Sequence, residues 1–147
     1  MDKEVLIRVV GTQVQEGEEA AEPIEILVPG QYFLKNGTHY FRYEEYMEDF
    51  KDPTLNYIKY NDHKLEVRKQ GLINVTMVFE PGKRTVSFYT TPYGTIEMGL
   101  TTRKLDIRDQ DENHVCVSVH YAMDMNDQHT SDCTLTLEAF AKHVIQL

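Results

Sequence analysis

The feature that most constrains this chain is a two-residue alternation of apolar and polar side chains, interrupted every few residues by a turn sequence. Residues 133–138 (CTLTLE) show the alternation clearly. This pattern is typical of short antiparallel strands with one buried face. Because no amphipathic helix of about 10–15 residues separates the strand-like runs, a parallel sheet with helical crossovers is excluded.

Turn sequences mark the expected strand boundaries. Asn36-Gly37 predicts a two-residue type I′ hairpin, Pro81-Gly82 a type II turn, and Asn61-Asp62 and Thr91-Pro92-Tyr93-Gly94 two further reversals. Pro29-Gly30 predicts a bend or bulge within a strand. Residues 15–22 are expected to be a loop, residues 48–53 a loop or one turn of helix, and residues 138–147 are a candidate terminal helix. Strands are expected over residues 3–14, 23–34, 39–47, 54–60, 64–69, 75–80, 84–90, 95–101, 105–108, 114–123 and 130–138.

These connections favour a single antiparallel meander, and closing the meander on itself removes its exposed edges. We therefore expect an all-β fold, an up-and-down barrel of about 8–10 strands. A β-sandwich is the alternative that the pattern leaves open. A length of 147 residues fits one domain, residues 1–147, with one hydrophobic core.

Charge and hydropathy exclude several classes of function. The net charge of −9 argues against binding to a nucleic-acid backbone and to an anionic membrane surface. The chain has no apolar run of the roughly 18 residues that span a bilayer, and its first residues lack the pattern of a secretory signal. We expect a cytoplasmic protein, a monomer or homodimer.

The two cysteines, Cys116 and Cys133, fall in the last two strand-like runs. With a turn near Asn126-Asp127 they are offset by roughly four residues, or about 13 Å, which is too far for a disulfide. They are predicted to be buried thiols.

The histidines show no spacing typical of a metal site. No catalytic signature or phosphate-binding glycine loop is present either, so we assign no metal, cofactor or catalytic residue. The six histidines are His39, His63, His114, His120, His129 and His143.

One strand combines aromatic residues with a carboxylate on the same face. Along residues 39–47, Tyr43 and Glu45 alternate onto one side, so Glu45 is predicted to point inward. A buried carboxylate needs a cation or hydrogen-bond donor, for which Arg8 is the first candidate and Arg68 the second. The pair could fix the strand register, anchor a ligand, or supply a general acid–base group.

Tyrosines recur in or beside the expected strands, and most should fill space in the sheet. Barrel mouths are common ligand sites, and Tyr89, Thr91 and Tyr93 around Pro92 form the expected rim of one. The predicted ligand site therefore consists of Arg8, Tyr43, Glu45, Arg68, Tyr89, Thr91 and Tyr93.

Four segments carry a resemblance to a known family: VLIRVVGTQ, IEILVPGQYFLKNGTHYFRYEE, MVFEPG and FYTTPYGTIEMGLTT, in that order between Val5 and Thr102. The chain resembles the YwiB-like family, a bacterial domain of unknown function, from Val5 to about Leu137. The resemblance implies a calycin-like, lipocalin-related barrel and brings no activity. The family pattern has a basic residue before a glycine, a role that either Arg68 or Lys69 fills here. The Gly-x-Trp signature of true lipocalins is absent, since the chain has no tryptophan.

Three functions remain. The first is a barrel that binds a small apolar or amphipathic ligand, which requires a cavity of roughly 300 Å³ or more. The second is a protein-interaction or structural module, which requires a contiguous exposed apolar patch. The third is an enzyme that uses Glu45 or Tyr43, which requires an accessible cleft and a strongly perturbed carboxylate.

Overall fold

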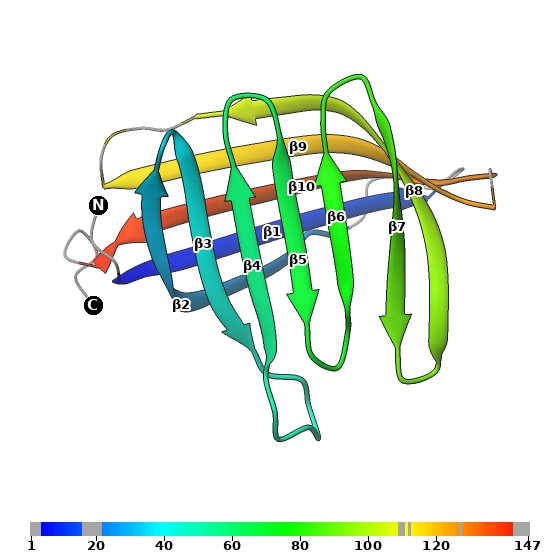
Figure 1. Cartoon of the computed structure of the whole chain (residues 1–147), viewed down its shortest axis with the longest axis horizontal. Coiled ribbons are helices and arrows are strands. Elements are labelled where there is room, and N and C mark those ends of the chain that lie inside the picture. The colour runs from blue at the N-terminus through cyan, green and yellow to red at the C-terminus, as the bar shows by residue number, and fades with distance from the viewer. Residues whose placement is uncertain (1–3, 16–21, 109–110, 112, 127, 143–147) are drawn as a thin grey trace.

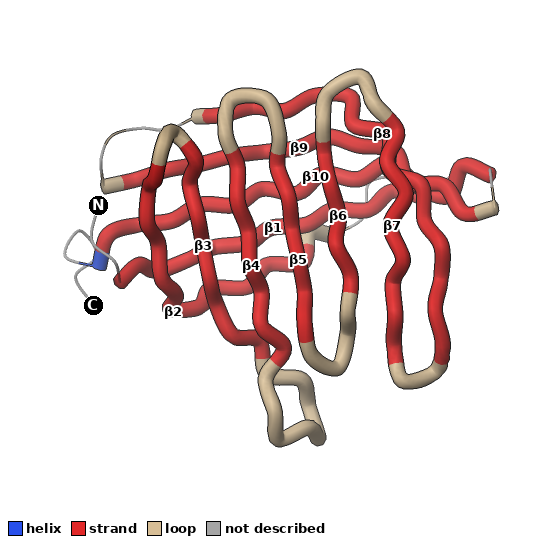
Figure 2. Tube along the Cα trace, viewed as in Figure 1, coloured by secondary structure: helices blue, strands red, loops and turns tan. Residues whose placement is uncertain are grey.

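The computed structural model describes residues 4–15, 22–108, 111, 113–126 and 128–142. Within these residues the chain forms ten antiparallel strands joined in one sheet (Figure 1). Figure 2 shows that strand accounts for most of the described chain. The strands are β1 (Glu4–Gln15), β2 (Ile24–Lys35), β3 (Thr38–Glu45), β4 (Thr54–Tyr60), β5 (Leu65–Gln70), β6 (Val75–Phe79), β7 (Arg84–Thr91), β8 (Gly94–Ile107), β9 (His114–Met125) and β10 (Gln128–Ala141).

The sheet is nearly closed into a barrel, which decides between the barrel and the sandwich. Its strand order is β6-β5-β4-β3-β2-β1-β10-β9-β8-β7, so the first and last strands pair in the middle of the sheet. The β1–β10 ladder runs from Val5 opposite Ala141 to Gln15 opposite Ser131. In Figure 1 the strands β3 to β7 cross the direction of β1, β9 and β10, which lie behind them.

Two strands turn the corners between these layers. β2 pairs with β1 up to Gln31 and with β3 from Gln31 onward, so it bends at the predicted Pro29-Gly30. A Cβ added at Gly30 would lie 2.7 Å from the carbonyl oxygen of Arg42, so the corner requires glycine. β8 bends where its register with β9 shifts between Thr102 and Lys104, a β-bulge.

The two ends of the sheet, β6 and β7, meet without forming a ladder in the described part of the chain. The backbones of Asn74 and Thr90 exchange two hydrogen bonds of 2.9 Å, and the Thr85 hydroxyl donates to the Val78 carbonyl at 2.6 Å. Between these attachments the two strands border a cavity whose lining includes Val75 and Thr76 of β6 and Val86, Ser87 and Phe88 of β7. We call this cavity the slit.

One end of the barrel is filled by an aromatic cluster. His39 stacks on Tyr60 with ring centroids 4.4 Å apart, and the Tyr32 hydroxyl lies 2.7 Å from His39 Nδ1. Phe41 packs between Tyr32 and Tyr60, at centroid distances of 5.0 and 5.8 Å. Below this cluster, small and branched apolar side chains fill the barrel, so the core is solid at this end. Its fully buried members include Val5, Ile7, Leu65, Phe79, Val119 and Ala139.

Most of the predicted turns and strands are confirmed. Asn36 and Gly37 both have positive φ, 51° and 77°, as a type I′ turn requires. Gly82 has a φ of 79°, and Lys83 donates its backbone N–H to Glu80, consistent with a type II turn. The strands expected over 95–101 and 105–108 are one strand, because the bulge redirects the chain without ending the pairing.

The terminal helix expected from residue 138 was wrong for its first part. Glu138 to Ala141 continue β10, pairing with β1 on one side and β9 on the other. Residues 143–147 lie outside the described residues. No helix in the described part of the chain is long and apolar enough to cross a membrane.

Candidate functional site

The end of the barrel opposite the aromatic cluster holds a cavity of about 630 Å³, which we call the lumen cavity. It opens where β1, β3, β5, β7 and β9 end, so inward-facing side chains from almost the whole barrel reach it. Its volume lies in the usual range of roughly 300–1,000 Å³ for small-molecule sites. Its apolar wall is formed by Val9, Ile26, Met77, Met98, Met123 and Leu135, with Tyr43, Tyr89 and Tyr121.

The wall of the lumen cavity carries a partly buried polar group that spans three strands. Tyr43 of β3, Asn56 of β4 and Lys69 of β5 lie opposite one another in register and face inward. Lys69 Nζ lies 2.8 Å from Asn56 Oδ1 and 3.1 Å from Glu45 Oε1. Since Asn56 is fully buried, Lys69 both satisfies its amide oxygen and neutralises Glu45. Among the residues of the described strands, Glu45 is the only carboxylate that lines the cavity. Its charge is paired with that of Lys69.

Tyr43 lies directly opposite Asn56 in the β3–β4 ladder. It is 4% exposed, and burial, together with the charge of Glu45, raises the pKa of its hydroxyl. The phenol therefore stays neutral and can donate a hydrogen bond to a bound molecule.

A second tyrosine lies on the opposite wall. Tyr121 packs on Phe79 with ring centroids 4.7 Å apart and lies opposite Cys133 in the β9–β10 ladder. Burial is the main cause that raises the pKa of Tyr121, and the Cys133 thiol adds to it. Cys116 and Cys133 are both buried, as predicted.

The structure brings together part of the predicted site. Tyr43, Glu45 and Tyr89 line the lumen cavity, and Arg68 lines the slit on the outer side of β5. Thr91 and Tyr93 do not line the cavity: the Thr91 hydroxyl bonds within its own turn, and Tyr93 is 99% exposed. Of the three residues predicted to form a rim around Pro92, only Tyr89 lines the cavity.

The expected pairing of Arg8 with Glu45 is wrong. Arg8 lies on the outer face, where its Nε contacts Glu25 at 2.7 Å and its Nη1 contacts Glu138 at 2.9 Å. The hydrogen bond from Arg8 also lowers the pKa of Glu25. The physical reason is that side chains alternate between the two faces of a strand. Val5 and Ile7 lie on the buried face of β1, so Arg8, which follows Ile7, points outward.

Several cavity residues were missed by sequence reasoning. Lys69 was seen only as one of two basic residues before Gly71, although it follows Val67 in the inward-facing register. The methionines Met77, Met98 and Met123 were not singled out. What these methionines share is an inward-facing position near the open end of the barrel. This position can be identified only once the barrel fold is known.

The described part of the chain holds no group of three or more histidine, cysteine, aspartate or glutamate side chains that could bind a metal. His143 lies outside the described residues.

The geometry defines a small, nearly closed antiparallel β-barrel with one filled end and one open, partly polar lumen. The profile of the domain of unknown function DUF1934 matches residues 7–137, and the chain belongs to this family. It is 26% identical over 140 residues to the uncharacterized β-barrel protein YwiB of Bacillus subtilis (strain 168), covering 94% of this chain and 96% of YwiB. The crystal structure of B. subtilis YwiB matches with a TM-score of 0.72 at 25% identity, over 94% of each chain. The expected YwiB-like family and barrel fold are thereby confirmed.

Proposed function

We propose that this barrel binds a small amphipathic molecule in its lumen cavity. The observation that carries the proposal is the contrast between the two ends of the barrel. One end is packed solid, whereas the other keeps about 630 Å³ open behind an apolar, methionine-rich wall. Methionine side chains adapt to ligands of irregular shape, and few polar groups suffice to orient a ligand in such a site.

The polar group in the wall supports an amphipathic ligand over a purely apolar one. Lys69 uses two of its three donors on Asn56 and Glu45, which leaves one N–H for a ligand. The neutral Tyr43 hydroxyl adds a further donor in the same cavity. A ligand with an acceptor near one end and an apolar body matches this arrangement.

Catalysis by Glu45 or Tyr43 has less support. Glu45 is paired with Lys69, and the raised pKa of Tyr43 keeps its phenol protonated, so that it is not available as a base and is a weak acid. The family resemblance implies a calycin-like barrel. We include this relationship in the proposal, because a calycin-like barrel is consistent with ligand binding in the lumen. We also propose a cytoplasmic location, since two cysteines whose predicted positions are too far apart for a disulfide suit a reducing compartment.

The proposal is tested by filling the lumen. Gly11 lines the lumen cavity, and a Cβ added there meets no atom within 4 Å, so the side chain of Gly11→Leu is expected to extend into the cavity. The neutral fluorescent probe N-phenyl-1-naphthylamine should bind the native protein and lose about tenfold or more in affinity for Gly11→Leu, because an isobutyl group occupies its volume.

The matched control is Val10→Leu, a neighbouring substitution on the outer face of β1. It should leave probe affinity within about twofold of the unsubstituted protein. Native mass spectrometry of protein purified from its own host should show a small molecule that is lost on unfolding. Equal probe binding by both variants, or none by the native protein, contradicts a lumen site.

A further inference from the structure

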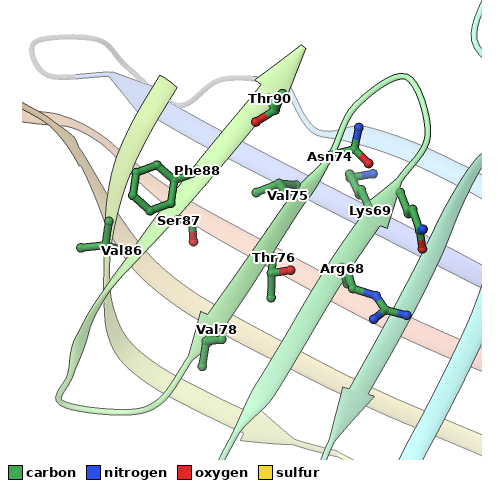
Figure 3. A pocket seen from close by; sticks show the side chains of 11 residues that line it. Arg68, Lys69, Asn74, Val75, Thr76, Val78, Val86, Ser87, Phe88 and Thr90 are labelled. Carbon is green, nitrogen blue, oxygen red and sulfur yellow. The ribbon is translucent and has the colours of Figure 1, made fainter. Parts of the chain in front are cut away.

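The slit between β6 and β7 is a second cavity, of about 620 Å³, distinct from the mouth of the lumen. Figure 3 shows its side chains: Arg68 and Lys69 come from β5, Thr76 and Val78 from β6, and Ser87 and Phe88 from β7. Lys69 lines both the slit and the lumen cavity. The two cavities therefore share Lys69 as a common wall residue.

The charge of the slit is opposite to that of the chain. The protein has a net charge of −9, yet the residues that line the slit include Arg68 and Lys69 and no aspartate or glutamate. Since Lys69 is paired with Glu45, Arg68 carries the positive charge of the slit. Arg68 has no carboxylate partner among the described residues. Its guanidinium rests over the Tyr57 ring, 4.6 Å from the centroid. A cation–π contact of this kind leaves the guanidinium N–H groups free to bind an anion.

A buried hydroxyl without a partner also lies in the slit. Ser87 is 2% exposed, and its Oγ has no hydrogen-bond partner within the described chain. Figure 3 places its side chain between the β7 and β6 ribbons. Thr54 and Thr102 share this condition, but neither lines the slit. Leaving such a hydroxyl unsatisfied is costly, and a ligand oxygen would remove the cost.

The outer rim of the slit is apolar. Val86 is 46% and Phe88 58% exposed, and both lie on the outer face of β7 beside the opening. Apolar side chains therefore lie both at this rim and in the lumen cavity, and Ser87 and Lys69 are polar residues of the slit.

We propose that the slit opens into the lumen beside Lys69 and holds the anionic head group, a carboxylate or phosphate, of an elongated amphipathic ligand whose tail lies in the lumen. Arg68 binds the anion from outside the wall, and the Ser87 hydroxyl donates to it from within. The proposal rests on the proposed function and specifies the class of ligand.

The test compares ligands that share a ten-carbon tail and differ in the head group. Decanoate, decyl phosphate, decanol and decyltrimethylammonium each compete against N-phenyl-1-naphthylamine. The two anions should displace the probe at concentrations about tenfold lower than decanol, since charge-assisted hydrogen bonds to arginine are strong. Decyltrimethylammonium should be the weakest. The ratio between decanoate and decyl phosphate then identifies which anion the slit prefers.

Three variants assign the preference to the slit. Arg68→Gln should reduce the advantage of the anions over decanol by about fivefold or more. Arg42→Gln is the matched control, because this substitution changes the net charge by the same amount. Arg42 lies over the same Tyr57 ring, 5.9 Å from its centroid, but does not line the slit. It should leave the advantage unchanged. Ser87→Ala should weaken decanoate about threefold without lowering the melting temperature.

The outcomes separate the two proposals. If the neutral probe binds but all four head groups compete equally, the anion site is overturned and the lumen site stands. Equal effects of Arg68→Gln and Arg42→Gln also overturn it, because general surface charge then explains the preference. Failure of the neutral probe to bind overturns both.

Discussion

At the residue scale, Gly99 shows how one small side chain permits an ion pair across three strands. Arg84 of β7 donates from Nε and Nη2 to the two carboxylate oxygens of Asp124 on β9, at 3.0 and 2.7 Å. The pair passes over Gly99 of β8, where an added Cβ would lie 2.5 Å from both Asp124 oxygens. The hydrogen bond from Arg84 lowers the pKa of Asp124.

Gly99→Ala should therefore displace this pair and reduce stability by about 0.5–1 kcal/mol at neutral pH, as expected for a partly exposed pair. Because folding lowers the pKa of Asp124, its contribution is present above the unfolded value of about 3.9 and is lost as pH falls through the folded value. The cost of Gly99→Ala in urea unfolding should thus shrink below about pH 4. Asp124→Asn should behave alike and not add to it; equal costs at pH 7 and about pH 3 would contradict the assignment.

The face of a residue could be read from the sequence more reliably than its partner. Alternation correctly placed Tyr43 and Glu45 inside the barrel. The partner of Glu45 is Lys69, two strands away across Asn56, and only the strand order brings them together. Arg8 was misassigned because both faces of β1 are apolar, so alternation there gives no direction.

At the element scale, short turns were predictable and departures from regular pairing were not. Asn36-Gly37 acts through the φ values of two residues, so its hairpin is visible in the sequence. The bulge in β8 at Thr102–Lys104 depends on β9 and leaves no local signal. The slit is of the same kind, because the sequence of β6 and β7 predicts an ordinary hairpin around Pro81-Gly82, whereas the two strands separate between their two attachments.

The slit should have a measurable signature in amide hydrogen exchange. The amides of β6 and β7 that face the slit should exchange faster than those that face β5 and β8, because no ladder protects them. Thr85→Val removes the hydroxyl that bonds to Val78, so it should accelerate the slit-facing amides further and cost about 1 kcal/mol.

Thr136→Val is the control for that substitution, since the Thr136 hydroxyl contacts Ser118 at 2.8 Å on the β9–β10 side of the barrel. It should leave exchange at the slit unchanged. Uniform protection along β6 and β7 would show that the wall is closed in solution.

At the scale of the whole molecule, one pairing sets the topology. Every ladder joins strands that are consecutive in the chain, except β1 with β10. This ladder joins the two ends of the sequence, so it carries the largest loop-closure cost of the fold. An ion pair lies at the Val5–Ala141 end of this ladder, where Lys142 Nζ is 3.2 Å from Glu4 Oε2.

A circular permutant that links these ends and opens the chain between Pro81 and Gly82 makes every ladder sequential, from β7 through β10 and β1 to β6. Because contact order falls, it should refold about tenfold faster in stopped-flow urea dilution, while its stability changes little. A permutant opened at Asn36-Gly37 is the control: it makes β1–β10 local but separates β2 from β3, so it should gain no comparable speed. If the two refold at the same rate, closure of β1 on β10 does not limit folding, and the barrel assembles from another pairing.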